Sequence, residues 1–253
     1  MRRLTVIMTI PVSRIITGML IVFTSHTALF AQPAKAWEII FDGRSFKGWT
    51  IVDTPANVII KDSSFVIHMT KNTSRHVFIR TNKKYNDFIM ELDCRRDTLF
   101  DSGILFRAIK SPDTARVSLF GYMVKIDPSL TRRWTGGVFF DYGNYIEWMY
   151  PLADDLRAQQ AERVGEWNHY RLEAIGDHIK VWINGTPTTN MTNPRYKEGY
   201  IAFKIHYLKG TTWNENMSAA FKNIRIISSD PAKYSMKMDI PVKDVISGKK
   251  TYY

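Results

Sequence analysis

Two segments with the alternation of β-strands place basic side chains and a histidine opposite apolar faces. In the segment GYIAFKIH, Lys204 and His206 alternate with large apolar residues, and in GYMVKID, Lys125 and Asp127 do the same. Because successive side chains of a strand point to opposite faces, each pair lies on the more polar face of its strand. A histidine has an unperturbed pKa of about 6.5, which suits proton transfer, so His206 is the strongest candidate for a base or a metal ligand.

A third segment, GILFR, extends the same argument. Alternation places Gly103, Leu105 and Arg107 on one face of it. If the three strands are neighbours, Arg107 joins Lys125, Asp127, Lys204 and His206 on one polar floor. The opposing interpretation is a solvated outer face, which many antiparallel sheets have.

The elements that would position these residues are short strands separated by turns. Glycine and asparagine turn signals support a hairpin at Gly176-Asp177 and a turn that ends the next strand at Asn184-Gly185. A single helix is expected over residues 153–163, where ADDLRAQQAER lacks strand alternation. About ten strands with no repeating helix predict an all-β antiparallel sandwich. The expected strands are residues 65–69, 76–80, 87–94, 103–109, 121–127, 136–142, 169–175, 178–183, 199–205 and 219–227.

The two ends of the chain depart from this pattern. Residues 1–31 hold three arginines, no acidic residue and a mostly apolar run interrupted by polar residues, which predicts a cleaved secretory signal rather than a membrane span. A signal and a lone cysteine, Cys94, together favour a periplasmic or secreted bacterial protein. After Ser228 the strand pattern ends, and residues 229–253 are expected to form a mobile extension or a peripheral strap.

Charge and local motifs exclude several function classes. The formal charge is +11, and removal of residues 1–31 would leave +8. The basic residues are scattered and no nucleic-acid motif occurs, so no nucleic-acid partner is expected. The sequence also lacks H-x-H, H-E-x-x-H, an acidic calcium loop, a phosphate loop and a nucleophile elbow. A divalent metal stays possible without support from any local motif.

Eight segments in order resemble one family of proteins, the 3-keto-disaccharide hydrolases. The match spans about residues 37–228 and is carried by the order and spacing of the pieces. The segments are IFDGRSFKGW, YNDFIMELDCR, DSGILFR, GYMVKID, TGGVFFD, GEWNHYRLEAIGDHIKVWING, GYIAFKIH and FKNIRI. The corresponding family patterns include N-S-G-I-x-F-R, G-Y-E-x-Q-x-x-D and G-x-I-x-L-Q-x-H.

The resemblance implies a concanavalin-like jelly roll of two curved antiparallel sheets, with a site on the concave face. It also implies substrates that are glycosides oxidised to a ketone at C3. Such a ketone acidifies the C2 hydrogen, so a base at C2 and a cation near the C3 oxygen permit elimination of the C1 substituent, followed by addition of water. The resemblance therefore implies an exported hydrolase or lyase whose partner is a glycan or a 3-keto-glycoside.

Candidate roles follow from this chemistry. His206 matches a family histidine, and Lys125 and Lys204 are candidates for a base or for stabilising the enolate. Arg107, Asp127, Asp141 and Trp134 are candidates for binding the substrate: Arg107 through a hydroxyl, Trp134 through ring stacking. Structural roles stay open for each, including an ion pair of Arg107 with Asp101 or Asp127, a turn cap for Asp141 and a loop anchor for Trp134.

The chain departs from the family pattern at the expected site itself. Met123 and Lys125 stand where the pattern has glutamate and glutamine, Lys204 stands where it has glutamine, and Asp101 replaces an asparagine. Two outcomes therefore stay open: a lysine acts as the base or stabilises the enolate, or the protein is a catalytically degenerate carbohydrate-binding jelly roll. A third interpretation is an ordinary glycoside hydrolase that uses an acid pair such as Asp127 and Asp141.

Overall fold

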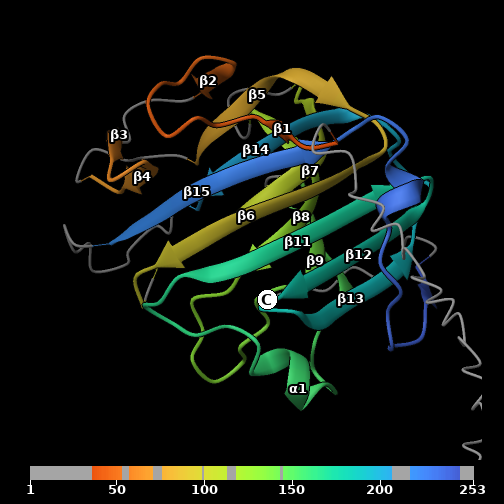
Figure 1. The fold of residues 1–253 in the computed structure, drawn as a ribbon. Helices are drawn as coiled ribbons and strands as arrows, with labels where there is room; N and C mark the ends of the chain where they lie inside the picture. Colours follow the sequence, from red (N-terminus) through yellow and green to blue (C-terminus); the bar gives the residue numbers. More distant parts are fainter. Residues whose placement is uncertain are drawn as a thin grey trace, which may run out of the picture. The chain divides into compact units, whose positions relative to one another are not determined.

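The chain forms two stacked β-sheets (Figure 1). The computed structural model describes residues 36–52, 57–70, 76–98, 100–112, 118–142, 145–206 and 217–245. The expected signal at residues 1–31 lies outside these residues. Every described strand pair is antiparallel except one at a sheet edge, which confirms the predicted all-β jelly roll. No described helix is both long and apolar enough to cross a membrane.

The first sheet carries all three segments with candidate site residues. It has seven strands, in the order β10 (Tyr145–Tyr150), β9 (Val138–Tyr142), β8 (Leu119–Ile126), β7 (Ser102–Lys110), β14 (Gly199–Ile205), β5 (Val77–Tyr85) and β2 (Trp49–Val52). The neighbours β8, β7 and β14 are the strands on which the predicted polar floor depends.

The second sheet has nine strands and lies in front in Figure 1. Its order is β16 (Lys243–Asp244), β13 (Thr186–Thr192), β12 (His178–Ile183), β11 (Asn168–Ile175), β6 (Phe88–Arg96), β15 (Ser218–Ile227), β4 (Ser64–His68) and β3 (Asn57–Lys61), with β1 (Glu38–Ile39) paired to β15. The β13–β16 pair is the parallel one.

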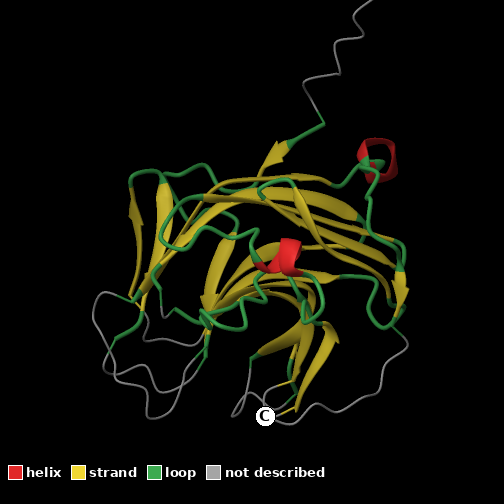
Figure 2. Ribbon diagram, turned by 90° about the horizontal axis from the view of Figure 1, so that it is seen from below, coloured by secondary structure: helices red, strands yellow, loops and turns green. Residues whose placement is uncertain are grey.

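The main core fills the space between the sheets, where the apolar side chains of the two sheets meet. Phe203 of β14 meets Phe65 of β4 and Phe221 of β15 at ring-centroid distances of 5.0 and 4.5 Å. Each of these rings is fully buried, and burial of such a side chain contributes about 2–3 kcal/mol. Figure 2 shows both sheets curving in the same sense over this core.

The predicted hairpin and the predicted turn are both present, and the turn joins β12 to β13, a strand that was not predicted from the sequence. β11 and β12 pair up to Ile175 and His178, with the turn at Gly176 and Asp177 between them. Asn184 and Gly185 join β12 to β13. Gly176, Asn184 and Gly185 all have positive φ angles, which these turns require. The expected helix over residues 153–163 shortens to the single turn α1 (Leu156–Gln159), capped by the Asp155 side chain, which accepts from Ala158 N.

The segment after residue 228 crosses the nine-stranded sheet. It forms the 3-10 helix η1 (Pro231–Tyr234) and then β16. Glu173 accepts hydrogen bonds from Ser235 Oγ and Met236 N, and Arg171 donates to Tyr234 O. The sequence left a mobile extension and a peripheral strap open, and residues 229–245 form a strap. Residues 246–253 lie outside the described part of the chain.

Candidate active site on the concave face

Backbone register aligns the two lysines across three adjacent strands. Gly103 of β7 pairs with Lys125 of β8 on one side and with Lys204 of β14 on the other. Side chains opposite each other on neighbouring strands share a face, so both lysines lie on one face of the seven-stranded sheet. We call it the concave face: it points away from the nine-stranded sheet (Figure 2). Alternation therefore placed Lys125 and Lys204 correctly.

Met123 occupies the space above Gly103. A Cβ atom added to Gly103 would collide with the Met123 side chain. Met123 is fully buried and belongs to a small apolar cluster on the concave face, separate from the main core. The residue that replaces the family glutamate thus fills the middle of this face between the two lysines. Lys125 and Lys204 are themselves buried, with 4% and 1% of their surface exposed.

Asp101 connects Lys125 to His206. Lys125 forms a short ion pair with Asp101 Oδ1, and His206 Nε2 lies 3.9 Å from the same oxygen. The His206 backbone N–H also donates to Asp101 O, at 3.1 Å. Lys125 of β8, Asp101 just before β7 and His206 just after β14 therefore meet. The His76 ring lies at right angles to the His206 ring, with centroids 5.2 Å apart.

The environment keeps the His206 imidazole neutral. Burial is the largest cause and moves the pKa of His206 well below its usual value. The positive charges of Lys204 and Lys125, and then His76, lower this pKa further. A neutral imidazole at neutral pH can accept a proton, so the state of His206 suits a base.

An aromatic wall continues from this cluster. Phe139 of β9 lies below the Lys125 ammonium, 5.4 Å from Nζ to the ring centroid, and its ring centroid is 6.2 Å from that of His206. Trp148 of β10 packs on Phe139 at 5.3 Å, and Trp134 meets Trp148 edge-on at 4.8 Å. Trp134, a predicted substrate-binding residue, therefore reaches the cluster through two other rings.

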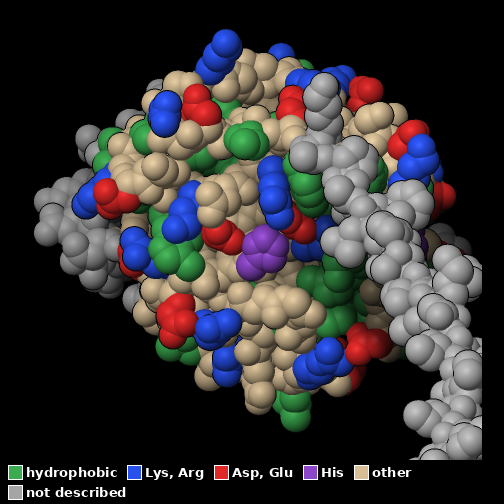
Figure 3. All heavy atoms as spheres, in the orientation of Figure 1, with side chains coloured by type: hydrophobic (Ala, Val, Ile, Leu, Met, Phe, Trp, Pro, Cys, Tyr) green, Lys and Arg blue, Asp and Glu red, His purple; other side chains and the backbone are tan. Residues whose placement is uncertain are grey.

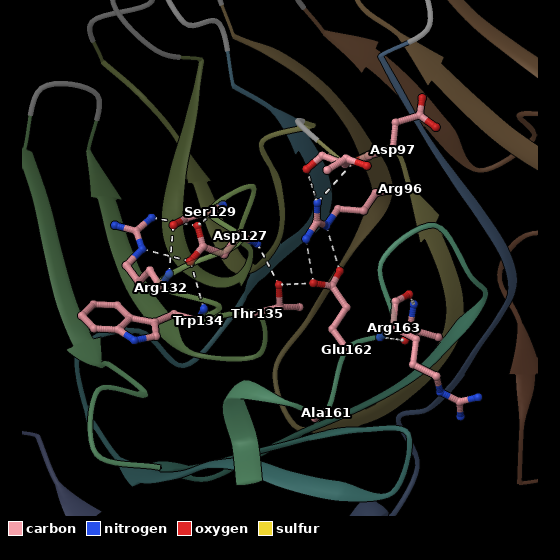
Figure 4. Close-up of polar contacts among 12 residues, drawn as sticks. Arg96, Asp97, Asp127, Ser129, Arg132, Trp134, Thr135, Ala161, Glu162 and Arg163 are labelled. Carbon is pink, nitrogen blue, oxygen red and sulfur yellow. Dashed lines mark hydrogen bonds and ion pairs between the residues drawn. The ribbon is translucent and has the colours of Figure 1, made fainter. Parts of the chain in front are cut away.

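Asp127, a second predicted binding residue, anchors the loop that carries Trp134 (Figure 4). It is fully buried, and its carboxylate accepts two hydrogen bonds from Arg132, at 2.8 and 2.9 Å, and others from Ser129 N and Trp134 N. Burial alone would raise the pKa of Asp127, but the bonds from Arg132 and from Trp134 N outweigh it and lower the pKa. Asp127 is therefore a poor proton donor, and its oxygens serve the loop.

A buried ion pair supports the same loop. Glu162 accepts two hydrogen bonds of 2.8 Å from Arg96 and one of 2.7 Å from Thr135 Oγ1, and Thr135 Oγ1 in turn accepts from Asp127 N (Figure 4). The network therefore joins the end of β6 in one sheet to the loop that follows β8 in the other.

Arg107 does not lie on the concave face, contrary to the prediction from alternation. A β-bulge between Phe106 and Ile109 inserts an extra residue, and Arg107 has a φ of 48°. After the bulge, Ala108 rather than Arg107 belongs to the concave-face cluster. The fully buried Arg107 side chain donates to Asn86 O, Gly176 O, Tyr196 O and Asp87 Oδ1, so it ties together loops at one end of the sandwich.

The last predicted residue, Asp141, lies in β9 opposite Gly121. Its side chain lies outside what the structure describes. No site role was predicted from the sequence for His76, Phe139, Trp148 or Arg132. Only the pairing of β5 with β14, which puts Val77 opposite Ile205, shows that His76 neighbours His206. Within the described ranges no group of three or more His, Cys, Asp or Glu residues could hold a metal ion.

Comparison with known proteins places this arrangement in a class. The fold matches a candidate glycosyl hydrolase from Parabacteroides distasonis (TM-score 0.58, 19% identity, 77% of this chain and 95% of that one). It also matches carbohydrate-binding module CBM66 from Bacillus subtilis (0.51, 17%, 72% and 96%). A third match is a prokaryotic β-1,3-1,4-glucanase from a mouse hindgut metagenome (0.50, 14%, 76% and 98%). The fold is therefore a jelly roll of the kind found in carbohydrate-active proteins.

The sequence defines the family more narrowly. Residues 36–227 match the model of the 3-keto-alpha-glucoside-1,2-lyase-like domain, and the chain belongs to that family. No curated relative was found by sequence comparison.

Proposed function

We propose that the protein acts on 3-keto-glycosides, by removal of the C2 proton and elimination of the C1 substituent. The observation that carries this proposal is the meeting of His206, Lys125 and Asp101 on the concave face of a chain that belongs to this family. The site offers a neutral base and a buried cation beside each other, which this chemistry needs.

The roles follow from the contacts. His206 takes the C2 proton, and the electrons of the C–H bond form an enolate with the C3 oxygen. The Lys125 ammonium, held by Asp101, stabilises the negative charge on that oxygen, and Lys204 adds positive charge nearby. When the C3 carbonyl re-forms, the C1–O bond breaks, the leaving group departs as an alcohol after protonation, and a C1–C2 double bond remains. Addition of water across that double bond completes a net hydrolysis.

The Trp134–Trp148 wall would hold the part of the substrate beyond the oxidised sugar. Its rings continue from Phe139, which contacts both catalytic candidates. Sugar rings stack on such aromatic surfaces through their apolar faces, so the wall suits a second sugar or another leaving group.

Incubation with a 3-keto-α-glucoside and with its unoxidised parent, each carrying a p-nitrophenyl leaving group, tests the proposal. Release from the ketone alone supports it, and cleavage of the parent refutes it. His206→Ala should lower turnover about 10²–10⁴-fold, the usual contribution of a general base. Lys125→Met should lower kcat more than it raises KM, because the enolate charge exists only after proton transfer.

Lys47→Met is the matched control for Lys125→Met, since Lys47 is an exposed lysine outside the concave-face cluster. It should turn over like the wild type. If Lys125→Met and His206→Ala also keep the wild-type rate, neither residue belongs to the catalytic site.

A second function is favoured by one observation, the burial of Met123 over Gly103. If the glutamate of the family pattern is the essential base in relatives, this chain lacks it, and the site would bind the sugar without turnover. Affinity for the ketone by calorimetry, with no released p-nitrophenol, would establish that outcome.

We also propose that residues 1–31 direct export, as expected for a protein that acts on external glycans. Mass measurement of the protein recovered from its bacterial host tests this proposal. A mature chain that begins near Gln32 supports it, and an intact N-terminus refutes it.

A further inference from the structure

The nine-stranded sheet also carries a hollowed surface, on its face away from the core. We call this face the outer face. Strand β6 turns Leu92 and Cys94 into the core, so alternation turns Asp93 and Arg95 to the outer face. Figure 3 views this face and shows basic, acidic and histidine side chains gathered over its middle strands.

Two neighbouring hollows lie on the outer face, one of about 440 Å³ and one of about 640 Å³. The smaller is lined by residues of β3, β4, β6 and β15 together with Gly165 and Trp167. The larger is lined by Asp93, His169 and Asn223, among others. Asp93 and Arg95 line one hollow each and are two residues apart on one strand face, a separation of about 7 Å. The turn at residues 62–64 likewise contributes to both hollows.

The smaller hollow combines a half-buried tryptophan with basic groups. Lys222 Nζ lies 4.0 Å from the centre of the Trp167 ring, and the Arg95 guanidinium carbon lies 5.0 Å from it. In the part of the chain that the structure describes, neither Arg95 nor Lys222 has an ion-pair partner. The surface beside them is recessed because Ala220, which has a small side chain, pairs with Arg95 on the neighbouring strand.

The acidic groups of the hollows are largely engaged. Asp97 Oδ2 accepts from Ser218 N and Ser218 Oγ, at 2.6 and 2.9 Å. Asp93 accepts from His169 Nδ1 at 2.9 Å and from Asn223 Nδ2 at 2.6 Å. These bonds occupy the carboxylates of Asp97 and Asp93, and Asp62 is the other acidic residue that lines the smaller hollow. Arg95 and Lys222 outnumber it beside Trp167, so an incoming ligand meets a mainly basic surface there.

The backbone of the larger hollow is shaped to present Asn223. A bulge between Lys222 and Arg225 disrupts the β15–β6 register, and Asn223 has a φ of 55°. Bulges of this kind re-aim a side chain, and here the amide reaches Asp93. Asp93, Asn223 and His169 thus form a polar group beside the apolar Phe41 and Ile224.

We propose that the outer face holds a second carbohydrate-binding site, separate from the concave face, which takes an acidic glycan. A sugar unit stacks on Trp167 while Arg95 and Lys222 bind its carboxylate or sulfate group. The next units extend over the Asp93–His169–Asn223 group, whose donors and acceptors suit sugar hydroxyls. The mainly positive charge of the chain favours the same class of ligand.

Affinity electrophoresis of the full protein in gels that contain one soluble polymer each tests this proposal. Polygalacturonate carries carboxylates, chondroitin sulfate carries sulfates as well, and dextran is the neutral arm. We expect retardation by at least one acidic polymer and none by dextran. A duplex DNA arm tests for binding of any polyanion. Retardation by DNA that is as strong as retardation by the glycans, and that is lost on substitution of Trp167, would refute a carbohydrate site.

Two variants locate the binding. Trp167→Ala and the double variant Arg95→Gln/Lys222→Gln should each raise the dissociation constant about tenfold, equivalent to about 1.4 kcal/mol. The double variant Lys47→Gln/Lys237→Gln removes two exposed lysines elsewhere and should bind like the wild type. Equal losses in this control would show that binding is diffuse and would overturn the proposal.

The experiment also separates this site from the proposed function. Lys125→Met, which alters the concave face, should leave retardation unchanged, and Trp167→Ala should leave turnover of a 3-keto-glucoside unchanged. Trp167→Phe keeps a ring for stacking and should bind nearly as well as the wild type. If Trp167→Ala fails to fold, the double variant Arg95→Gln/Lys222→Gln decides the outcome. Wild-type retardation in that double variant would overturn the proposal, as would an absence of retardation of the wild type by both acidic polymers.

Discussion

Replacement of Glu162 by glutamine should destabilise the protein strongly, although the side chain keeps its shape. Glu162 and Arg96 have 7% and 2% of their side-chain surface exposed, so the ion pair is buried. The substitution removes one charge and leaves the Arg96 guanidinium in a poorly solvated position. Loss of one partner of a buried pair costs about 3–5 kcal/mol. That is a large part of the usual total stability of about 5–15 kcal/mol.

Urea unfolding followed by tryptophan fluorescence measures this loss. With a slope of about 3 kcal/mol per molar urea, the midpoint should fall by about 1–1.7 M. Glu166→Gln is the matched control, because Glu166 is 63% exposed and lies 3.6 Å from an equally exposed Arg163. Its midpoint should stay close to that of the wild type, since exposed pairs contribute little.

The double variant Arg96→Met/Glu162→Met provides the decisive comparison. If the loss in Glu162→Gln arises from an uncompensated charge, removal of both charges should recover more than half of it. A Glu162→Gln midpoint within 0.3 M of the wild type, on the order of 1 kcal/mol at that slope, would refute the reasoning. So would a double variant less stable than the single one, because the pair would then contribute by contacts other than charge.

Three further perturbations test other parts of the structure. The pKa of His206 is lower in the folded than in the unfolded state, so the stability of the wild type should fall as the pH drops below about 6.5. Urea unfolding at about pH 7.5 and at about pH 5.5 measures this fall, and His206→Gln should make it smaller. Gly103→Ala should cost about 1–3 kcal/mol through its collision with Met123, and Met123→Ala in the same chain should restore much of it, as measured by thermal unfolding. Arg107→Met should cost about 3 kcal/mol, because the fully buried Arg107 side chain loses four hydrogen bonds to partly buried acceptors in these loops; an unchanged melting temperature would contradict its role in tying the loops together.

Local rules predicted the parts of the fold that local chemistry determines. The turns at Gly176 and at Asn184-Gly185 need positive φ angles, which these residues adopt easily, so the β11–β12 hairpin and the turn that ends β12 could be predicted from the sequence. Alternation placed Lys125 and Lys204 on one face because β8 and β14 stay regular at those positions.

Non-local features escaped the same rules. The bulge at Arg107 comes from pairing on both sides of β7, and a single extra residue reverses the face of every later side chain. β13 was missed because its sequence, TPTTNMT, is mostly polar, yet its threonines are buried and bond to Gly136 O in the opposite sheet. His76 joins the site only because β5 pairs with β14, more than a hundred residues later in the chain.

Two of the departures from the family pattern meet in space, and this contact explains how the site tolerates them. A buried lysine in place of glutamine would by itself add an uncompensated charge, which is costly in a poorly solvated position. Asp101, which replaces the pattern's asparagine, supplies the opposite charge to Lys125 directly. The two substitutions therefore act as one exchange of a neutral amide pair for an ion pair.

The exchange also changes what the site can do. A neutral amide pair offers weak hydrogen bonds, whereas the ion pair places a charged ammonium beside His206. Burial holds the pKa of His206 down, and the charges of Lys204 and then Lys125 lower it further. The substitution of Met123 for glutamate removes the carboxylate that would oppose this charge. The three changes together make the concave face more positive, which is the electrostatic change that stabilisation of an enolate would require. In the proposed mechanism the neutral imidazole of His206 takes the proton from C2, and this positive charge stabilises the enolate that forms.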